Sequence, residues 1–127
     1  MFLLDSTVVI EFLNATNLGI EIQKEYQDKE IAITAFTVHE VLRGVHEDEE
    51  EKRIAMNLFE QLPILTFDKK SAERSVHIEN QLRKLGTMIN EVDIFIAGIC
   101  QEHDASIVTH DKDFLKVPKL RVRMMEK

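Results

Sequence analysis

Four carboxylates stand where parallel strands and the helices after them would place side chains at one edge of a sheet. Asp5 follows the apolar run "MFLL", and Asp111 follows the apolar run "SIVT" with His110 between them. Glu40 lies in a helical pattern directly after "IAIT", and Asp93 lies early in the pattern that begins "NEVDIF". Because the carboxyl ends of parallel strands meet at one edge, we expect these four acids to share a site.

Such a group of acids points to divalent-metal chemistry. Four carboxylates at one edge repel one another and raise one another's pKa values unless a cation is bound. Oxygen ligands of this kind suit Mg²⁺ or Mn²⁺ better than zinc. The five histidines show no paired ligand spacing, and "HEVLR" lacks the second histidine of a zinc-protease helix. We interpret the histidines as surface or supporting residues, with His39 pointing away from Glu40. The predicted metal ligands, direct or through water, are Asp5, Glu40, Asp93 and Asp111.

Each acid also has a purely structural interpretation. A helix cap would explain Asp5 or Asp111, and an exposed helix position would explain Glu40. Asp93 is harder to explain in this way, because no basic residue lies one turn away from it. A buried carboxylate without a partner is costly. The helical neighbours of Asp93 are apolar or small: Ile96, Ala97 and Cys100.

Several residues beside these acids have a supporting role in the prediction. Asp113 either joins the metal shell or caps the turn "DFL". Gly44, one turn after Glu40, either lets a bulky polyanion approach or serves close helix packing. Hydroxyl side chains that could orient a carboxylate or a metal-bound water, or that simply end a strand or cap a helix, are Ser6, Thr7 and Thr109.

Strand and helix patterns alternate along the chain. Strands are expected at residues 1–4, 30–34, 64–67, 106–110 and 120–124. Helices are expected at residues 6–14, 18–29, 36–45, 50–62, 70–86 and 90–103, with a helical turn at 111–117. This alternation predicts a three-layer α/β/α fold with a central, mainly parallel sheet. The length and the absence of repeats or linkers predict a single domain over residues 1–127.

Composition narrows the class of protein. The formal net charge of −7 argues mildly against non-specific nucleic-acid binding. The charge is uneven, however, because many acids cluster in "HEDEEEKR", where they suit the start of a helix. No apolar stretch approaches the ~20 residues of a membrane span. The single cysteine, Cys100, fits the core of a protein in the reducing cytoplasm.

Three stretches together resemble a known family. "LLDSTVVIEFL", "ITAFTVHEVLRGV" and "INEVDIFIAGICQEHDASIVTHDKDF" resemble the PIN-domain family and, within it, the small stand-alone toxins of the VapBC type. The resemblance covers nearly the whole chain and places Thr109 and Ser6 at the family's hydroxyl positions. One departure is Thr7, where many members carry Asn. The residues that match the family's acidic quartet are Asp5, Glu40, Asp93 and Asp111.

The resemblance implies a metal-dependent endoribonuclease that hydrolyses RNA phosphodiesters with metal-activated water at the quartet. It also implies a homodimeric toxin whose antitoxin partner blocks the cleft. An apolar groove around Val8, Phe12 and Leu42 is either a docking place or part of the core. Basic residues that could hold the RNA backbone are Arg43, Lys69, Lys70, Arg74 and Lys112.

Other functions remain open on the sequence. A phosphatase of the haloacid dehalogenase type would need a second Asp two residues after Asp5, where Thr7 stands. A non-catalytic PIN-like module that binds RNA or protein would have no reason to keep four mutually repelling acids. A metal-dependent DNA nuclease would use the same residues as a ribonuclease, and activity on matched RNA and DNA strands distinguishes the two.

Overall fold

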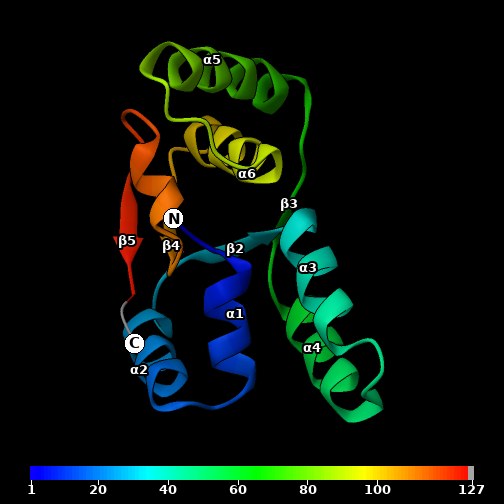
Figure 1. Cartoon of the computed structure of the whole chain (residues 1–127). Coiled ribbons are helices and arrows are strands. Elements are labelled where there is room, and N and C mark those ends of the chain that lie inside the picture. Colours follow the sequence, from blue (N-terminus) through cyan, green and yellow to red (C-terminus); the bar gives the residue numbers. More distant parts are fainter. Residues whose placement is uncertain (126–127) are drawn as a thin grey trace.

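A five-stranded sheet forms the centre of the computed structural model, which describes residues 1–125 (Figure 1). The strand order is β3-β2-β1-β4-β5, and every strand pairing within these residues is parallel. The mainly parallel sheet expected from the sequence is therefore confirmed. The strands are β1 (Phe2–Leu4), β2 (Ile31–Thr34), β3 (Ile64–Leu65), β4 (Ser106–Thr109) and β5 (Val122–Met124).

Helices cover both faces of this sheet. The helices are α1 (Ser6–Leu13), α2 (Asn17–Tyr26), α3 (Ala35–Val45), α4 (Glu49–Gln61), α5 (Lys69–Leu85) and α6 (Glu91–Glu102), with the 3₁₀ helix η1 at Lys112–Lys116. Helices α5 and α6 lie on one side of the sheet, and α1 to α4 lie on the other (Figure 1). The three-layer α/β/α arrangement expected from the sequence is confirmed.

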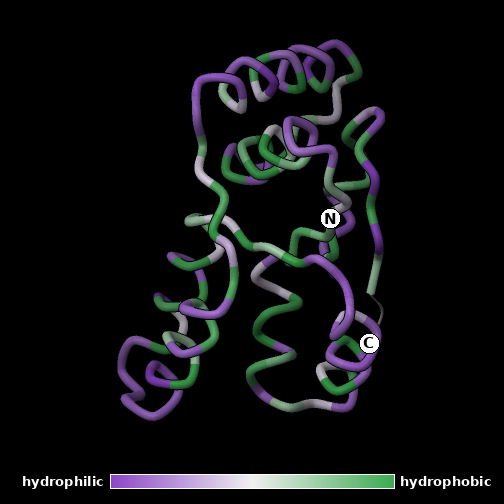
Figure 2. Tube along the Cα trace, turned by 180° about the vertical axis from the view of Figure 1, so that it is seen from behind, coloured by the Kyte–Doolittle hydropathy of each residue, from purple (hydrophilic) through white to green (hydrophobic). Residues whose placement is uncertain are grey.

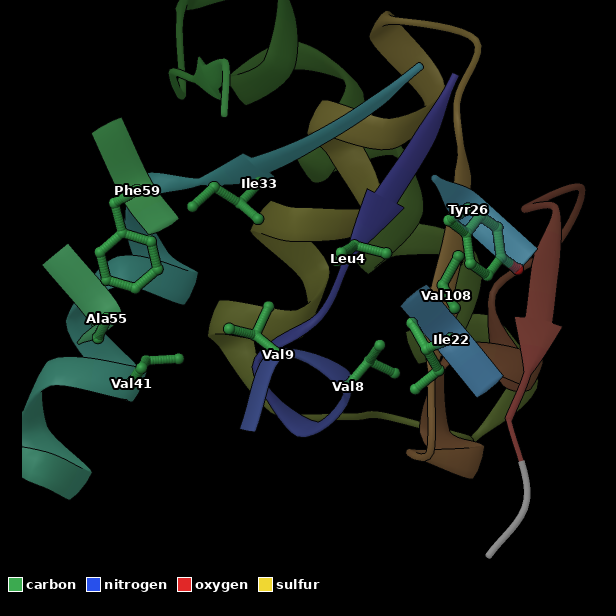
Figure 3. Packing of buried hydrophobic residues seen from close by; sticks show 10 residues of the cluster. All are labelled: Leu4, Val8, Val9, Ile22, Tyr26, Ile33, Val41, Ala55, Phe59 and Val108. Carbon is green, nitrogen blue, oxygen red and sulfur yellow. The ribbon is translucent and has the colours of Figure 1, made fainter. Parts of the chain in front are cut away.

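The alternation of side chains along the strands explains the two layers. Leu3 of β1 is buried in the cluster under α6, whereas its neighbour Leu4 is buried in the cluster under α1 and α2. In β4, Ile107 and Val108 divide between the same two clusters. Successive residues of a strand point to opposite faces, so fully apolar strands bury both. Figure 3 shows the cluster under α1 and α2, with Tyr26 and Phe59 at its ends.

Hydropathy along the chain agrees with this burial. Figure 2 shows α1 as hydrophobic along most of its length, whereas the connection between α3 and α4 is hydrophilic. That connection contains Asp48, which accepts a hydrogen bond from the backbone N–H of Glu51 at 3.0 Å and so caps α4. The acid-rich run thus begins a helix, as expected. Across residues 1–125, none of the helices combines the length and apolar character needed to span a bilayer.

All five strands are shorter than predicted, β3 and β5 by two residues each and the others by one. β3 ends at Leu65 rather than at residue 67, because the chain turns there towards the Asp68 cap of α5. β5 begins at Val122 rather than at residue 120, and Lys119, one residue before the predicted start, adopts a left-handed conformation with φ 64°. A residue in that conformation breaks the extended backbone that a strand needs.

Candidate active site

The structure brings the four predicted acids into one pocket. Asp5 follows β1, Asp111 follows the end of β4 by two residues, Glu40 lies in α3, and Asp93 lies in the first turn of α6. All four line a pocket of about 380 Å³, called the acid pocket below. It is further lined by Ser6, Thr7, Phe36, His39, Arg43, Asn90 and Val92. Because β1, β2 and β4 are parallel, their carboxyl ends place these side chains at the same edge of the sheet.

Asp5 is held by hydroxyl groups and is only 4% exposed. Its Oδ2 accepts hydrogen bonds from Thr109 Oγ1 at 2.7 Å and Thr7 Oγ1 at 3.0 Å. Burial raises the pKa of the Asp5 carboxyl, and these two hydrogen bonds lower it in part. Although Asp5 occupies the cap position of α1, its side chain makes no capping hydrogen bond. Helix capping therefore does not explain this carboxylate.

The same hydroxyls connect the segment that follows β1 to the segment at the end of β4. Thr109 Oγ1 accepts a hydrogen bond from the Asp111 backbone N–H at 2.9 Å. Thr7 Oγ1 accepts one from the His110 backbone N–H at 3.1 Å. Thr7, at the position where many family members carry Asn, thus uses its single hydroxyl both as a donor to Asp5 and as an acceptor.

Asp93 has the most perturbed acid–base behaviour of the four acids. Burial, followed by repulsion from the carboxylates of Asp111, Asp5 and Glu40, raises the pKa of Asp93 from 3.8 to about 7. Carboxylate oxygens of Asp93, Asp111 and Asp113 all lie within 4.8 Å of one another. The sequence indicated that Asp93 has no basic residue one helical turn away. In the structure, it lies with two other acids that are close enough to share one cation with it.

Asp113 and Asp111 divide the roles that the sequence left open. Asp111 Oδ1 accepts a hydrogen bond from the Asp113 backbone N–H at 2.9 Å and so caps η1. The Asp113 carboxylate joins the group of three acids and pairs with Lys116 at 3.0 Å. Of the two acids for which the sequence offered a cap here, Asp111 makes it, because the capping carboxylate must precede the first turn.

Glu40 supplies a buried oxygen that lacks a partner. Its Oε1 is inaccessible to solvent and has no hydrogen-bond partner among residues 1–125. Burial and the charge of Asp5 raise the pKa of Glu40, while Arg43 and the Ser6 side chain lower it. A buried carboxylate oxygen without a donor is unfavourable unless a cation satisfies it. The all-oxygen donor set and this unpaired atom fit Mg²⁺ or Mn²⁺.

The predicted basic residues separate into two groups. Arg43 lines the acid pocket, and the exposed His39 also lines it. Lys112 is an exposed residue of η1 and, within residues 1–125, is not part of the pocket lining.

The remaining basic candidates belong to α5. Lys69 pairs with Glu73 of the same helix at 3.1 Å. Lys70 and Arg74 line a separate polar pocket together with Glu102. None of the three is among the described residues that line the acid pocket.

Sequence reasoning missed three residues of the pocket lining: Phe36, Asn90 and Val92. Asn90 was detectable, because it immediately precedes the helix that carries Asp93. Its Oδ1 accepts a hydrogen bond from the Val92 backbone N–H at 2.9 Å and caps α6. Phe36 and Val92 gave no signal, since apolar residues at helix starts are usually assigned to the core.

This fold and pocket define a PIN-domain protein: the family model of the PIN domain matches residues 2–120, so the chain belongs to that family. It is similar to ribonuclease VapC2 of Haemophilus influenzae, with 27% identity over 124 residues and 94% of each chain covered. The family expected from the sequence is confirmed.

Solved structures share the same fold. The chain is similar to VapBC2 from Rickettsia felis bound to a promoter DNA fragment, with a TM-score of 0.85, 20% identity and 98% of each chain covered. It is also similar to FitAcB from Neisseria gonorrhoeae, with a TM-score of 0.81, 24% identity and 96% of each chain covered. At these identities the likeness supports the fold.

Proposed function

We propose that this chain is a divalent-metal-dependent endoribonuclease that acts as the toxin of a toxin–antitoxin pair. The observation that carries the proposal is the acid pocket, where one buried and three half-buried carboxylates gather at the carboxyl edge of a parallel sheet with Arg43 as the one arginine or lysine among the described lining residues. Membership of the PIN family and similarity to proteins named ribonuclease VapC support the same activity.

The pocket residues would bind Mg²⁺ or Mn²⁺. Asp5 and Asp93 are the proposed main ligands, and Asp111 and Glu40 complete the shell directly or through water. Asp113 joins them because its carboxylate lies within 4.8 Å of those of Asp93 and Asp111. A bound divalent ion would neutralise phosphate charge and lower the pKa of an attacking water.

The other residues of the pocket orient these ligands and the substrate. Thr109 and Thr7 hold Asp5 in one orientation through their two hydrogen bonds to Oδ2. Arg43, at the mouth of the pocket, would contact the RNA phosphodiester backbone. Lys112 is a second candidate for the backbone, whereas Lys69 would reach only RNA that extends to α5.

A groove on the other side of α1 fits the antitoxin. It has a volume of about 330 Å³, and its lining is mainly apolar. The sequence left open whether Val8, Phe12 and Leu42 form a docking groove or part of the core. Val8 is buried in a core cluster and Leu42 packs against it, whereas Phe12 lines this groove. The groove would take the apolar face of an antitoxin helix, and the resemblance further implies a homodimer. The half-buried apolar residues of its lining, which a partner can contact, are Phe12, Ile31, Leu58 and Leu62, whereas Val9, Ile22 and Tyr26 are buried beneath them.

Cleavage of a structured RNA and of a DNA of the same sequence tests the enzymatic proposal. The wild-type protein is assayed with Mn²⁺, Mg²⁺ or EDTA beside Asp93→Asn and the control Asp28→Asn, which changes an exposed acid outside the pocket. We expect metal-dependent cleavage of RNA that is lost in Asp93→Asn and kept in the control. Equal cleavage by wild type and Asp93→Asn would refute the site, and preferential cleavage of DNA would favour the DNA nuclease.

Sequencing of the flanking DNA for a short reading frame, followed by co-expression with its product, tests the partner. We expect a stable complex in which cleavage is inhibited, and sedimentation of the toxin alone should give the mass of a dimer. If the nuclease were active but formed no complex, the toxin–antitoxin proposal would be refuted and the nuclease proposal would stand.

A further inference from the structure

Three phenylalanine rings from distant parts of the chain meet beside the acid pocket. Phe36 begins α3, Phe67 lies between β3 and α5, and Phe95 lies in α6. The ring centroids of Phe67 and Phe95 are 4.7 Å apart, and those of Phe36 are 5.9 and 5.7 Å from them. Each ring therefore contacts the other two, and we call the group the ring cluster.

The ring cluster is not sealed inside the protein. Phe67 is 36% exposed, and Phe36 and Phe95 are half-buried, whereas Phe114 of the core is 0% exposed. Leaving aromatic surface in water forgoes the stabilisation that burial would provide. Several such rings in contact at the surface therefore indicate a binding surface.

The cluster is continuous with the acid pocket. Phe36 lies one helical turn before Glu40, and both line that pocket. Of the three rings, Phe36 alone is among the described residues that line the pocket, and the Phe95 ring is connected to it by their contact, with centroids 5.7 Å apart. A ligand that places a negatively charged group at the acids through a divalent ion can therefore rest a flat, apolar group on these rings. A nucleotide has both groups, joined by a sugar.

We propose that the ring cluster binds an unpaired nucleobase next to the phosphate held at the acid pocket. This inference rests on the proposed function and deepens it, because it specifies single-stranded or looped RNA as the substrate. Aromatic rings bind unpaired bases by stacking on their π faces, and such stacking tolerates many sequences. Bases inside an RNA helix are stacked on their neighbours and have no free face for these rings.

A fluorescent base tests the stacking directly. A short oligoribonucleotide carrying one 2-aminopurine is bound to the wild-type protein with Ca²⁺, and electrophoresis verifies that the RNA remains intact. The chain contains no tryptophan, so the emission of 2-aminopurine is read with little protein background. Scanning the label along the oligonucleotide should find one position where binding quenches the fluorescence, since stacking on a ring quenches this base.

Variants of Phe67 identify the ring responsible. We expect Phe67→Leu to remove the quenching and to weaken binding by about 5- to 150-fold, while Phe67→Tyr keeps both. Phe2→Leu, at a half-buried phenylalanine of β1 whose ring packs against Tyr26 and which is not among the described residues that line the acid pocket, is the matched control and should behave as wild type. Replacing the quenched base by an abasic unit should weaken wild-type binding by the same factor and leave Phe67→Leu unaffected.

Three outcomes would overturn the inference. If neither the abasic unit nor Phe67→Leu changed the RNA affinity, the base site alone would be refuted and the nuclease proposal would stand. A fall to half the sedimenting mass in Phe67→Leu, with unchanged RNA affinity, would mean that the rings join two copies of the chain. No binding of any oligonucleotide by the wild-type protein would refute this inference together with the ribonuclease proposal.

Discussion

In the absence of metal, the folded protein disfavours the ionised form of the Asp93 carboxyl group. Its pKa is raised from 3.8 to about 7, mainly by burial. Between these two values the folded state binds more protons at Asp93 than the unfolded state does. The free energy of unfolding therefore decreases as the pH rises through this range, and the loss is complete above about pH 7. This loss of stability is the free-energy cost of placing the Asp93 carboxylate in a half-buried site among other acids, where a cation could bind.

The metal-free protein should accordingly melt at a lower temperature at pH 8 than at pH 5.5. In Asp93→Asn this difference should be smaller, and the variant should melt above the wild type at pH 8, because a neutral amide is not repelled by the other acids. Melting in EDTA, followed by circular dichroism at both pH values, measures the effect. Asp28→Asn should follow the wild-type curve, and a variant less stable than wild type at pH 8 would contradict the argument.

Thr109 is fully buried, and its hydroxyl group hydrogen-bonds both to the Asp5 carboxylate and to the Asp111 backbone. Thr109→Val keeps the shape of the side chain but removes the donor to Asp5 and the acceptor for the Asp111 N–H. We expect a decrease of about 10- to 100-fold in Mn²⁺ affinity or in cleavage, which is the usual effect of losing a group that orients a ligand. Thr109→Ser should restore most of it. Isothermal titration with Mn²⁺ provides a measurement that does not depend on activity.

At the scale of elements, the packing of α5 on α6 depends on a glycine. A Cβ atom added at Gly98 would lie 2.8 Å from the Ser71 carbonyl oxygen and 3.1 Å from Ser75 Cβ. A backbone atom of another helix cannot move aside without separating the two helices. Gly44, in contrast, has no atom within 4 Å of such a Cβ among the described residues. Close helix packing therefore explains Gly98 and does not explain Gly44.

These two glycines form a matched pair for measurement. Gly98→Ala should lower the free energy of unfolding by about 1–3 kcal/mol, because it overpacks the interface. Gly44→Ala should raise it by about 0.5–1 kcal/mol, because alanine favours the helix. Urea denaturation of both variants tests this difference. An equal effect of the two substitutions would contradict the packing described.

The sequence predicted the elements well because their signals are local. Asp48 and Asp68 mark helix starts, and Gly86, with φ 69°, marks the end of α5. The acids were found because each follows a strand or starts a helix, and a parallel sheet brings such positions together. The ring cluster could not be found, because Phe36, Phe67 and Phe95 are separated by whole elements. Only the folded chain shows that their rings touch.

At the scale of the whole molecule, a bound cation should stabilise the fold. An ion that binds only the native state stabilises it by about 2.7 kcal/mol at a concentration of roughly 100 times its Kd. We expect Mn²⁺ to raise the melting temperature of wild type at pH 7.5, and to raise that of Asp93→Asn and Asp5→Asn much less. Equal shifts in all three proteins would mean that the ion binds outside the acid pocket.

The central position of β1 has a consequence for synthesis of the chain. β1 lies between β2 and β4, and β4 begins only at Ser106. A protein is made from its N-terminus, so Asp5 leaves the ribosome long before Asp111 exists to stand beside it. The acid pocket of the proposed nuclease thus cannot be complete until Asp111 has been made. Growing chains that still lack Asp111 would therefore have an incomplete acid pocket while they lie next to the messenger and ribosomal RNA of the ribosome that makes them.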